Sequence, residues 1–128
     1  MATSNQINNL LDTKQKKLSF FQNLVLVATA DGYVDRMESD FLVMIGNQLE
    51  LTEEDTRPIA DNYATLRFII PDDSLQRTVE LQTLVMMMLQ DGKLSEKEYS
   101  LCLDYTRRIG YTDARLNELI RTLGEGNL

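Results

Sequence analysis

DGYVDRME at residues 31–38 occurs again sixty residues later as DGKLSEKE at residues 91–98. Identical or similar residues keep the same offset, without a gap, on both sides of these segments: Gln22 and Gln82, Leu24 and Leu84, Val25 and Val85, Leu49 and Ile109, and Thr52 and Thr112. A constant offset over so many positions is typical of an internal repeat. We therefore expect a duplicated domain whose halves cover about residues 15–60 and 75–120, with acidic loops at equivalent places.

The composition limits the class of protein. With 128 residues, 43% of them apolar, the chain is long enough to form a single domain with its own core over residues 1–128. Glycine and proline are few, which favours helix. The formal net charge of −7 disfavours nucleic acid and anionic membranes as partners, because both are bound through clusters of Lys and Arg. A protein partner is expected instead.

The residue types that the chain lacks exclude several kinds of active site. It has no histidine, so a Ser-His or Cys-His catalytic pair cannot form and histidine cannot bind a metal. Cys102 is the single cysteine, which excludes a thiol cluster and an intrachain disulfide. Flanked by two leucines, it is expected to be a small buried core residue. We expect no enzymatic activity and no organic cofactor.

The sequence predicts neither export nor membrane insertion. Its first residues, MATSNQINNLLD, lack the basic segment and the long apolar run of a secretory signal. The densest apolar runs, near residues 24–30 and 84–89, are too short to cross a bilayer. A soluble, cytoplasmic protein is therefore expected.

Two long helices are expected at the centre of an all-α fold. The first runs from the N-cap Thr13 to Ala30, and the second from Asp73 to Gln90. Their apolar residues cover much of the helix circumference, which is typical of a helix surrounded by others. We expect a pseudo-twofold axis to relate these two buried helices.

Shorter amphipathic helices bring the expected total to about seven. They are predicted over Ser4–Leu11, over 36–49 and 96–109, and after N-caps at Thr52 and Thr112.

Three stretches are harder to assign. Pro58 lies too deep in its helix to belong to the first turn, so the helix should kink or restart there. Residues 66–71 fit either a helix or an extended chain, and Pro71 ends the stretch. The tail from Gly124 is expected to be loose.

The repeated segment matches part of an EF-hand calcium loop. In that alignment Asp31 takes the fifth position, Gly32 the sixth and Glu38 the bidentate twelfth, and the second copy fits in the same way. Positions one and three then fall on Val27 and Thr29, inside the preceding helix and without carboxylates. Ca²⁺ takes six to eight oxygen ligands, so an ordinary EF-hand is excluded.

Helix capping explains most of the segment. Gly32 and Gly92 can end the preceding helices in a left-handed conformation. Asp35-x-x-Glu38 and Ser95-x-x-Glu98 have the spacing of capping boxes.

Capping does not account for Asp31 and Asp91. Each places a carboxylate at a helix C-terminus, where the macrodipole disfavours negative charge by about 0.3–1 kcal/mol. Two explanations remain open. The carboxylates accept hydrogen bonds from free amides of the following helix, or they face a cation.

The paired segments, each between an apolar helix and an amphipathic one, resemble the TerB-like family of tellurite-resistance proteins over about residues 15–123. The resemblance implies a compact, duplicated, all-helical domain of the bacterial cytoplasm that is associated with tellurite and other stress responses. It further implies a divalent metal, Ca²⁺ or Mg²⁺, held by acidic loop residues, which by position are Asp31, Asp35, Glu38, Asp91 and Glu98.

The second loop departs from that pattern, because Ser95 replaces the acid that corresponds to Asp35. A similar domain precedes a J-domain in membrane-anchored co-chaperones. This chain has no transmembrane segment in its sequence, and without histidine it cannot contain the His-Pro-Asp motif of a J-domain.

We predict a non-enzymatic stress-response module with a weak divalent-cation site at its acidic loops. The alternative is a protein-interaction module whose loop acids only cap helices and whose partner docks on an exposed groove or acidic face. A hydrolase with paired carboxylates is a third reading, and it needs those carboxylates in a pocket. The deciding feature is whether the loops at 31–38 and 91–98 lie close enough to share an ion.

Overall fold

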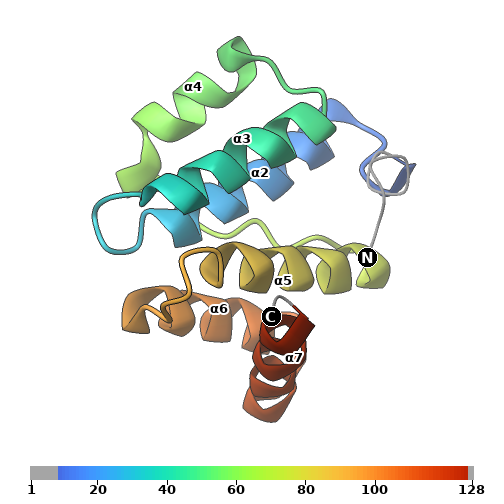
Figure 1. Cartoon of the computed structure of the whole chain (residues 1–128). Coiled ribbons are helices and arrows are strands. Elements are labelled where there is room, and N and C mark those ends of the chain that lie inside the picture. Colours follow the sequence, from blue (N-terminus) through green and yellow to red (C-terminus); the bar gives the residue numbers. More distant parts are fainter. Residues whose placement is uncertain (1–8, 127–128) are drawn as a thin grey trace.

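All regular secondary structure is helical in residues 9–126, the part of the chain that the computed structural model describes (Figure 1). The all-α prediction is confirmed, whereas the helix expected over Ser4–Leu11 falls mainly outside the described residues. The helices are α2 (Lys14–Ala28), α3 (Arg36–Gln48), α4 (Glu53–Asp61), the short 3₁₀ helix η1 (Tyr63–Thr65), α5 (Ser74–Met88), α6 (Glu96–Arg108) and α7 (Asp113–Gly126).

The helix bounds repeat along the chain. α2 and α5 each span 15 residues, α3 and α6 each span 13, and the members of each pair begin 60 residues apart. α4 and α7 also begin 60 residues apart, but they differ in length, with 9 and 14 residues. The spacing of the helices therefore follows the spacing of the sequence repeat.

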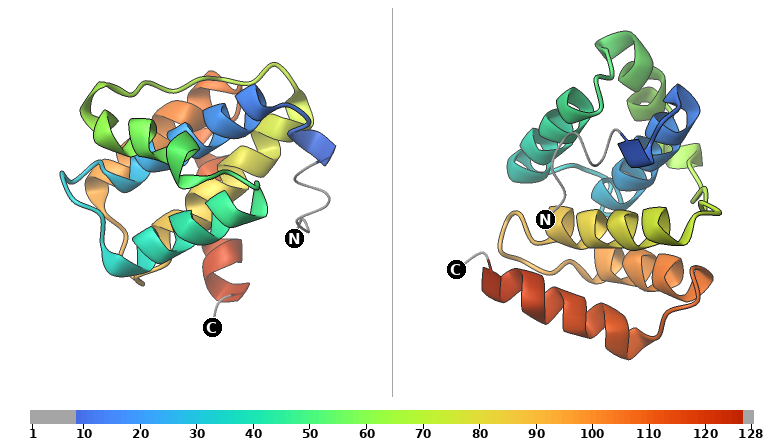
Figure 2. Two further views of the ribbon diagram at one scale, coloured as in Figure 1. Left: turned by 90° about the horizontal axis from the view of Figure 1, so that it is seen from above. Right: turned by 90° about the vertical axis from the view of Figure 1, so that its right-hand side faces the viewer.

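The helices α2 and α5 pack against each other in the middle of the molecule. α2 also packs on α3 and α4, while α5 packs on α6 and α7, which form the lower layers in Figure 2. Side chains from both helices that are at most 1% exposed fill the interface: Phe20, Leu24, Val27, Leu81, Leu84 and Met88. Burial of such hydrocarbon surface is the main favourable term in folding.

Cys102 is fully buried beside this core, and burial raises the pKa of its thiol to about 12. It is a core residue, as the sequence predicts. Among the described residues, no helix is both long enough and apolar enough to span a membrane.

The structure corrects two local expectations, the restart of a helix at Pro58 and the loose tail from Gly124. α4 does not restart at Pro58 but continues through it to Asp61. The proline and the preceding turn are exposed, so water can hydrogen-bond the carbonyl that loses its amide partner. The chain from Gly124 is not loose up to Gly126, because it forms the last turn of α7 and approaches Leu89 on α5.

Residues 66–70, which the sequence leaves open, form an irregular extended strap across α2. Asn23 holds it by both backbone groups of Ile69: its Nδ2 donates to the carbonyl (2.9 Å) and its Oδ1 accepts from the amide (3.0 Å). The Asn23 Nδ2 group also donates to Glu80 on α5 at 2.9 Å. One buried amide side chain thus joins the strap to both central helices.

Glu80 is 1% exposed, and burial raises the pKa of its carboxyl group. Besides Asn23 it accepts hydrogen bonds from Gln76 (2.8 Å) and from the Tyr105 hydroxyl (3.3 Å). Its oxygens are fully engaged in this structural network, which is the condition for burying a polar group at low cost.

We expect Asn23→Leu to lower the free energy of unfolding by about 3 kcal/mol, because it leaves both Ile69 backbone groups without their partner and removes one of the three hydrogen bonds that Glu80 accepts. Urea denaturation followed by circular dichroism measures this change. The exposed Asn47→Leu is the matched control and should change stability by about 0.5 kcal/mol or less. Equal effects of the two substitutions would contradict the structural role given to Asn23.

Candidate metal centre

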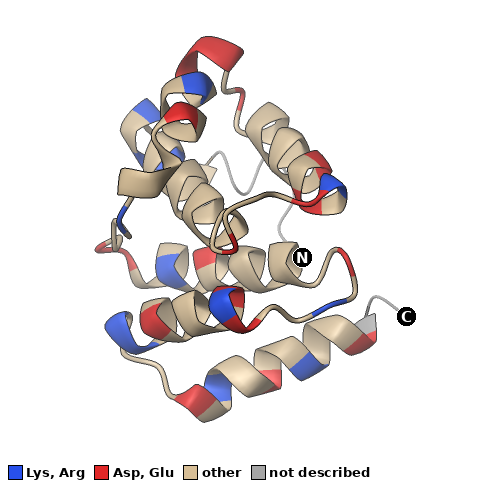
Figure 3. Ribbon diagram, turned by 90° about the vertical axis from the view of Figure 1, so that its left-hand side faces the viewer, with Lys and Arg blue, Asp and Glu red and all other residues tan. Residues whose placement is uncertain are grey.

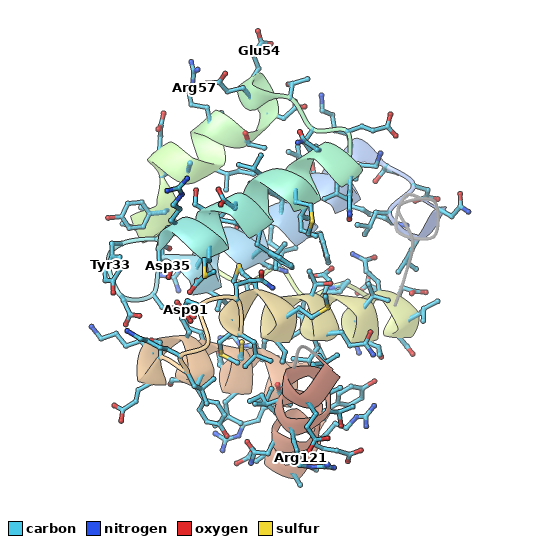
Figure 4. The ribbon with its side chains drawn as sticks, viewed as in Figure 1. Tyr33, Asp35, Glu54, Arg57, Asp91 and Arg121 are labelled. Atoms are coloured by element: carbon cyan, nitrogen blue, oxygen red, sulfur yellow. The ribbon has the colours of Figure 1, made fainter. Side chains whose placement is uncertain are left out.

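The two repeated segments lie beside each other at one end of α2 and α5. Ser95 Oγ donates a 2.7 Å hydrogen bond to Asp31 Oδ2 and so joins the second loop to the first. Both loops line one hollow of about 540 Å³. Figure 4 shows Asp35 and Asp91 close to each other on these neighbouring loops.

Each loop begins with a turn that requires glycine. The φ angles of Gly32 and Gly92 are +86° and +75°, in the left-handed region that other residues rarely adopt. Their amides donate to the carbonyls of Thr29 (2.9 Å) and Leu89 (3.1 Å), which closes the C-terminal turns of α2 and α5. Because α2 and α5 pack side by side, the loops that follow these two helices begin at adjacent points.

The N-caps of the next helices are formed as the sequence predicts. Asp35 Oδ1 accepts from the Glu38 amide at 2.8 Å, and Ser95 Oγ accepts from the Glu98 amide at 3.4 Å. These side chains supply the acceptors that the first turns of α3 and α6 need.

The expectation that Glu38 and Glu98 complete the capping boxes is wrong. At Thr52–Asp55 both reciprocal bonds of a capping box are present. Glu38 and Glu98 turn into the protein instead and are only 3% and 4% exposed. The reason is their position, since each lies on the buried face of its helix.

Two buried carboxyl groups therefore meet where the halves of the chain join. Glu38 and Glu98 lie within hydrogen-bonding reach of each other, and the Oε1 atom of each is buried without a hydrogen-bond partner. These are the two side-chain atoms in the described residues that are buried and unsatisfied. Buried oxygens in native structures are nearly always hydrogen-bonded, so a proton, a water molecule or a cation is expected beside these two.

Burial dominates the electrostatics of this pair. The pKa of Glu38 is raised to about 7, mainly by burial; the hydrogen bond with Glu98 opposes this shift, and the charges of Asp35, Asp91 and Asp31 add to it. Burial raises the pKa of Glu98 to about 9, with the charge of Glu38 as the next contribution. The pair is stabilised by whatever supplies positive charge, a proton or a cation.

All five residues predicted from the sequence line the hollow: Asp31, Asp35, Glu38, Asp91 and Glu98. Three of them, Asp35, Glu38 and Asp91, have carboxylate oxygens within 4.8 Å of one another. The loops thus lie close enough for their acidic residues to face one ion.

The hydrogen bonds of Asp31 and Asp91 bear on the first of the two readings left open above. Asp31 accepts from the Ser95 hydroxyl in the other half, and Asp91 Oδ1 accepts from the Lys93 amide in its own loop at 2.9 Å. The first explanation, hydrogen bonds to the amides of the following helix, does not hold.

Sequence reasoning undervalued Ser95, which it treated as a lost ligand. Its hydroxyl caps α6 and holds Asp31 across the interface, so it organises the site. Tyr33 and Lys93 also line the hollow and were not singled out. The burial of Glu38 could have been read from its spacing, because Phe41 and Ile45 follow it at i+3 and i+7 on the same helix face.

The amino-terminal part of the chain is similar to a known family. Residues 1–61 match the family model described as Tellurite resistance protein TerB, and they include the first acidic loop. No curated protein and no solved structure gives a significant match.

We expect the protein to lose stability as the pH rises from about 5 to about 9. The pKa values of Glu38 and Glu98 are raised from 4.5 in the folded state, so folding takes up protons that the unfolded chain has released over this range. Glu98→Gln should flatten the pH dependence and, at pH 8, should be more stable than the parent by roughly 1–3 kcal/mol. Thermal unfolding across the pH range measures both effects.

The control is Glu96→Gln, which changes an exposed glutamate two residues away in the same helix turn. It should leave the slope of stability against pH unaltered. Parallel curves for Glu98→Gln and the parent would contradict the assigned role of the buried pair.

Proposed function

We propose that the protein is a non-enzymatic, cytoplasmic stress-response module that binds a hard divalent cation between its two acidic loops. The observation that carries this proposal is the pair of buried, unpartnered oxygens on Glu38 and Glu98, two residues that line a hollow together with three further carboxylates. Its TerB-like character supports a role related to tellurite resistance.

The donor set favours Ca²⁺ or Mg²⁺ among divalent ions. Every candidate ligand is a carboxylate, with the Ser95 hydroxyl beside them, and hard cations prefer such oxygens. The described part of the hollow offers no thiolate or imidazole, the ligands that select softer metals. Asp35, Glu38 and Asp91 would form the nearest group, with Asp31 and Glu98 adjoining them.

A cation at this place would join the two halves of the chain. Its ligands come from the α2–α3 loop and α3 on one side, and from the α5–α6 loop and α6 on the other. Binding would neutralise mutually repelling carboxylates and stabilise the folded state in proportion to occupancy. The ion would thereby act as a clamp between two helix–loop–helix units.

The repeat itself is part of the proposal. We infer that the domain arose by internal duplication, because both the sequence pattern and the helix bounds recur at one offset. The five ligand candidates then derive from one ancestral loop, used twice around a pseudo-twofold axis.

The alternative reading, in which the loop acids serve only as caps, explains Asp35 and Ser95 but not the inward glutamates. A protein partner remains part of the proposal.

We expect Ca²⁺ or Mg²⁺ to bind the metal-free protein with a dissociation constant on the order of 0.1–1 mM, in the range of weak all-oxygen sites. At ten times that concentration the ion should stabilise the fold by about 1.4 kcal/mol. Titration calorimetry and thermal unfolding with each ion measure the two quantities. Absence of both heat and stabilisation at 10 mM metal would refute the proposal.

The ligand assignment is tested by Asp35→Asn combined with Asp91→Asn, which keeps side-chain shape and the N-cap acceptor. This variant should bind the ion at least tenfold more weakly. Asp61→Asn with Asp72→Asn alters two exposed aspartates outside the hollow and should bind as the parent does.

A further inference from the structure

An apolar groove lies between α3 and α4, and among the described residues Tyr33 alone lines both this groove and the acidic hollow. The volume of the groove is about 700 Å³, and Phe21 and Val25 are buried beneath it. Two large side chains that line it are exposed, Val43 at 61% and Tyr63 at 40%. A concave, mostly apolar site of this size is typical of the sites that bind small molecules.

The second half of the chain fills the equivalent space with its own side chains. α6 and α7 pack closely against each other, whereas α3 and α4 are in much looser contact. At the positions where α7 has the buried Leu116 and the core-packed Ile120, α4 has the smaller Thr56 and Ala60. The groove is therefore a feature of the first half alone, at a place where the second half is packed with hydrocarbon.

The groove side of α3 also has small residues. Ser39 lies at the position of Tyr99 on α6, whose hydroxyl donates a 2.7 Å hydrogen bond to α7. Gly46 lies at the position of Thr106, which is fully buried. A Cβ atom added at Gly46 would meet only Phe21 Cε1, at the ordinary contact distance of 3.5 Å, so packing does not require a glycine here. Small residues on both helices thus leave the space open.

The groove is short, and the chain closes both of its ends. At one end the turn of residues 49–52 joins α3 to α4, and Leu51 and Thr52 of this turn line the groove. α4 runs back along α3 (Figure 1), so the other end lies at residues 32–34 and at Tyr63, which also line it. The nine residues of α4 span about 13 Å, at 1.5 Å per residue. A short groove with closed ends suits a compact molecule better than a long peptide helix.

The lining of the groove is electrically neutral. Glu53 and Arg57 on α4 are the charged side chains that line it in the described part of the chain, and they form an ion pair with each other. α3 has no charged residue from Phe41 to Gln48, and Figure 3 shows its charged positions confined to the first turns. An ionised ligand would lose its hydration here without gaining a free counter-charge. The lining therefore favours an uncharged ligand.

Two polar side chains of the lining are available to a ligand. Ser39 and Asn47 are exposed on α3, and no side-chain hydrogen bond engages either of them within residues 9–126. The hydroxyl groups of Thr29, Thr52 and Thr56 are already hydrogen-bonded within the protein. A few free polar groups in an apolar lining are what orients a small ligand.

We propose that this groove binds an uncharged, mostly apolar small molecule of about 20–30 non-hydrogen atoms. Its apolar part would cover Phe21 and Val25 and take the place that larger side chains fill in the second half of the chain. A hydroxyl or carbonyl group of the ligand would hydrogen-bond Ser39 or Asn47. This site is separate from the acidic hollow and does not require a cation.

The test uses Nile red, an uncharged apolar dye of this size whose fluorescence rises in apolar surroundings. Titration in EDTA, which keeps the cation site out of the measurement, should show saturable binding with a dissociation constant on the order of 10 μM, as for drug-sized ligands. Decan-1-ol should displace the dye at neutral pH. Decanoate and decylammonium, which have the same chain and a charge, should displace it at least tenfold more weakly.

The variant Thr56→Leu with Ala60→Ile copies the side chains of the second half into the groove and should weaken dye binding at least tenfold. The same side chains placed on the exposed face of α7, Ala114→Ile with Thr122→Leu, provide the matched control and should leave binding unchanged.

Ser39→Tyr is a second groove-filling variant, on a different helix, and thermal unfolding of each variant verifies that it is folded. Amide chemical shifts of the parent locate the dye without any substitution, and the changes should centre on α3 and α4. The proposal is overturned if the dye does not bind the parent or shifts amides elsewhere. It is also overturned if both folded groove variants bind as tightly as the control, or if either charged competitor displaces the dye as well as decan-1-ol does.

Discussion

The packing of α2 against α5 is the interaction on which the rest of the structure depends. It buries the most apolar side chains of both repeats, and it places the ends of the two helices side by side. Each helix ends in a glycine turn, so the two acidic loops emerge at adjacent points and Glu38 meets Glu98. The hydrophobic contact therefore forces together carboxylates that would otherwise repel. A proton or a cation relieves that repulsion, which links the core of the fold directly to its candidate site.

The two halves of the chain share this interface but differ elsewhere. Around α6 and α7 the charges balance, and large side chains close the space between the helices. Around α3 and α4 small side chains leave a groove, and acidic residues predominate.

Much of this could be predicted from the sequence, because the decisive signals are local. Helix caps at Thr13, Asp35 and Ser95 and the glycine turns depend on neighbouring residues and appear where expected. The repeat also pointed to the two loops that line one hollow. Contacts between residues far apart in the sequence could not be predicted. For example, Asn23 hydrogen-bonds the backbone of Ile69 in the 66–70 strap, 46 residues later in the chain. The burial of Glu38 and Glu98 was missed because their spacing from Asp35 and Ser95 also fits a capping box. Only the position of each glutamate on the buried face of its helix distinguishes a buried side chain from a capping one.

The central claim is that both loops contribute to one divalent-cation site built around Glu38 and Glu98. Anomalous diffraction from crystals grown with Mn²⁺, which binds oxygen ligands as Mg²⁺ and Ca²⁺ do, tests it most directly. The account predicts a single strong anomalous peak in the hollow, with oxygen ligands from residues 31–38 and from residues 91–98. A peak bound by one loop alone, or metal found only elsewhere on the surface, would contradict it.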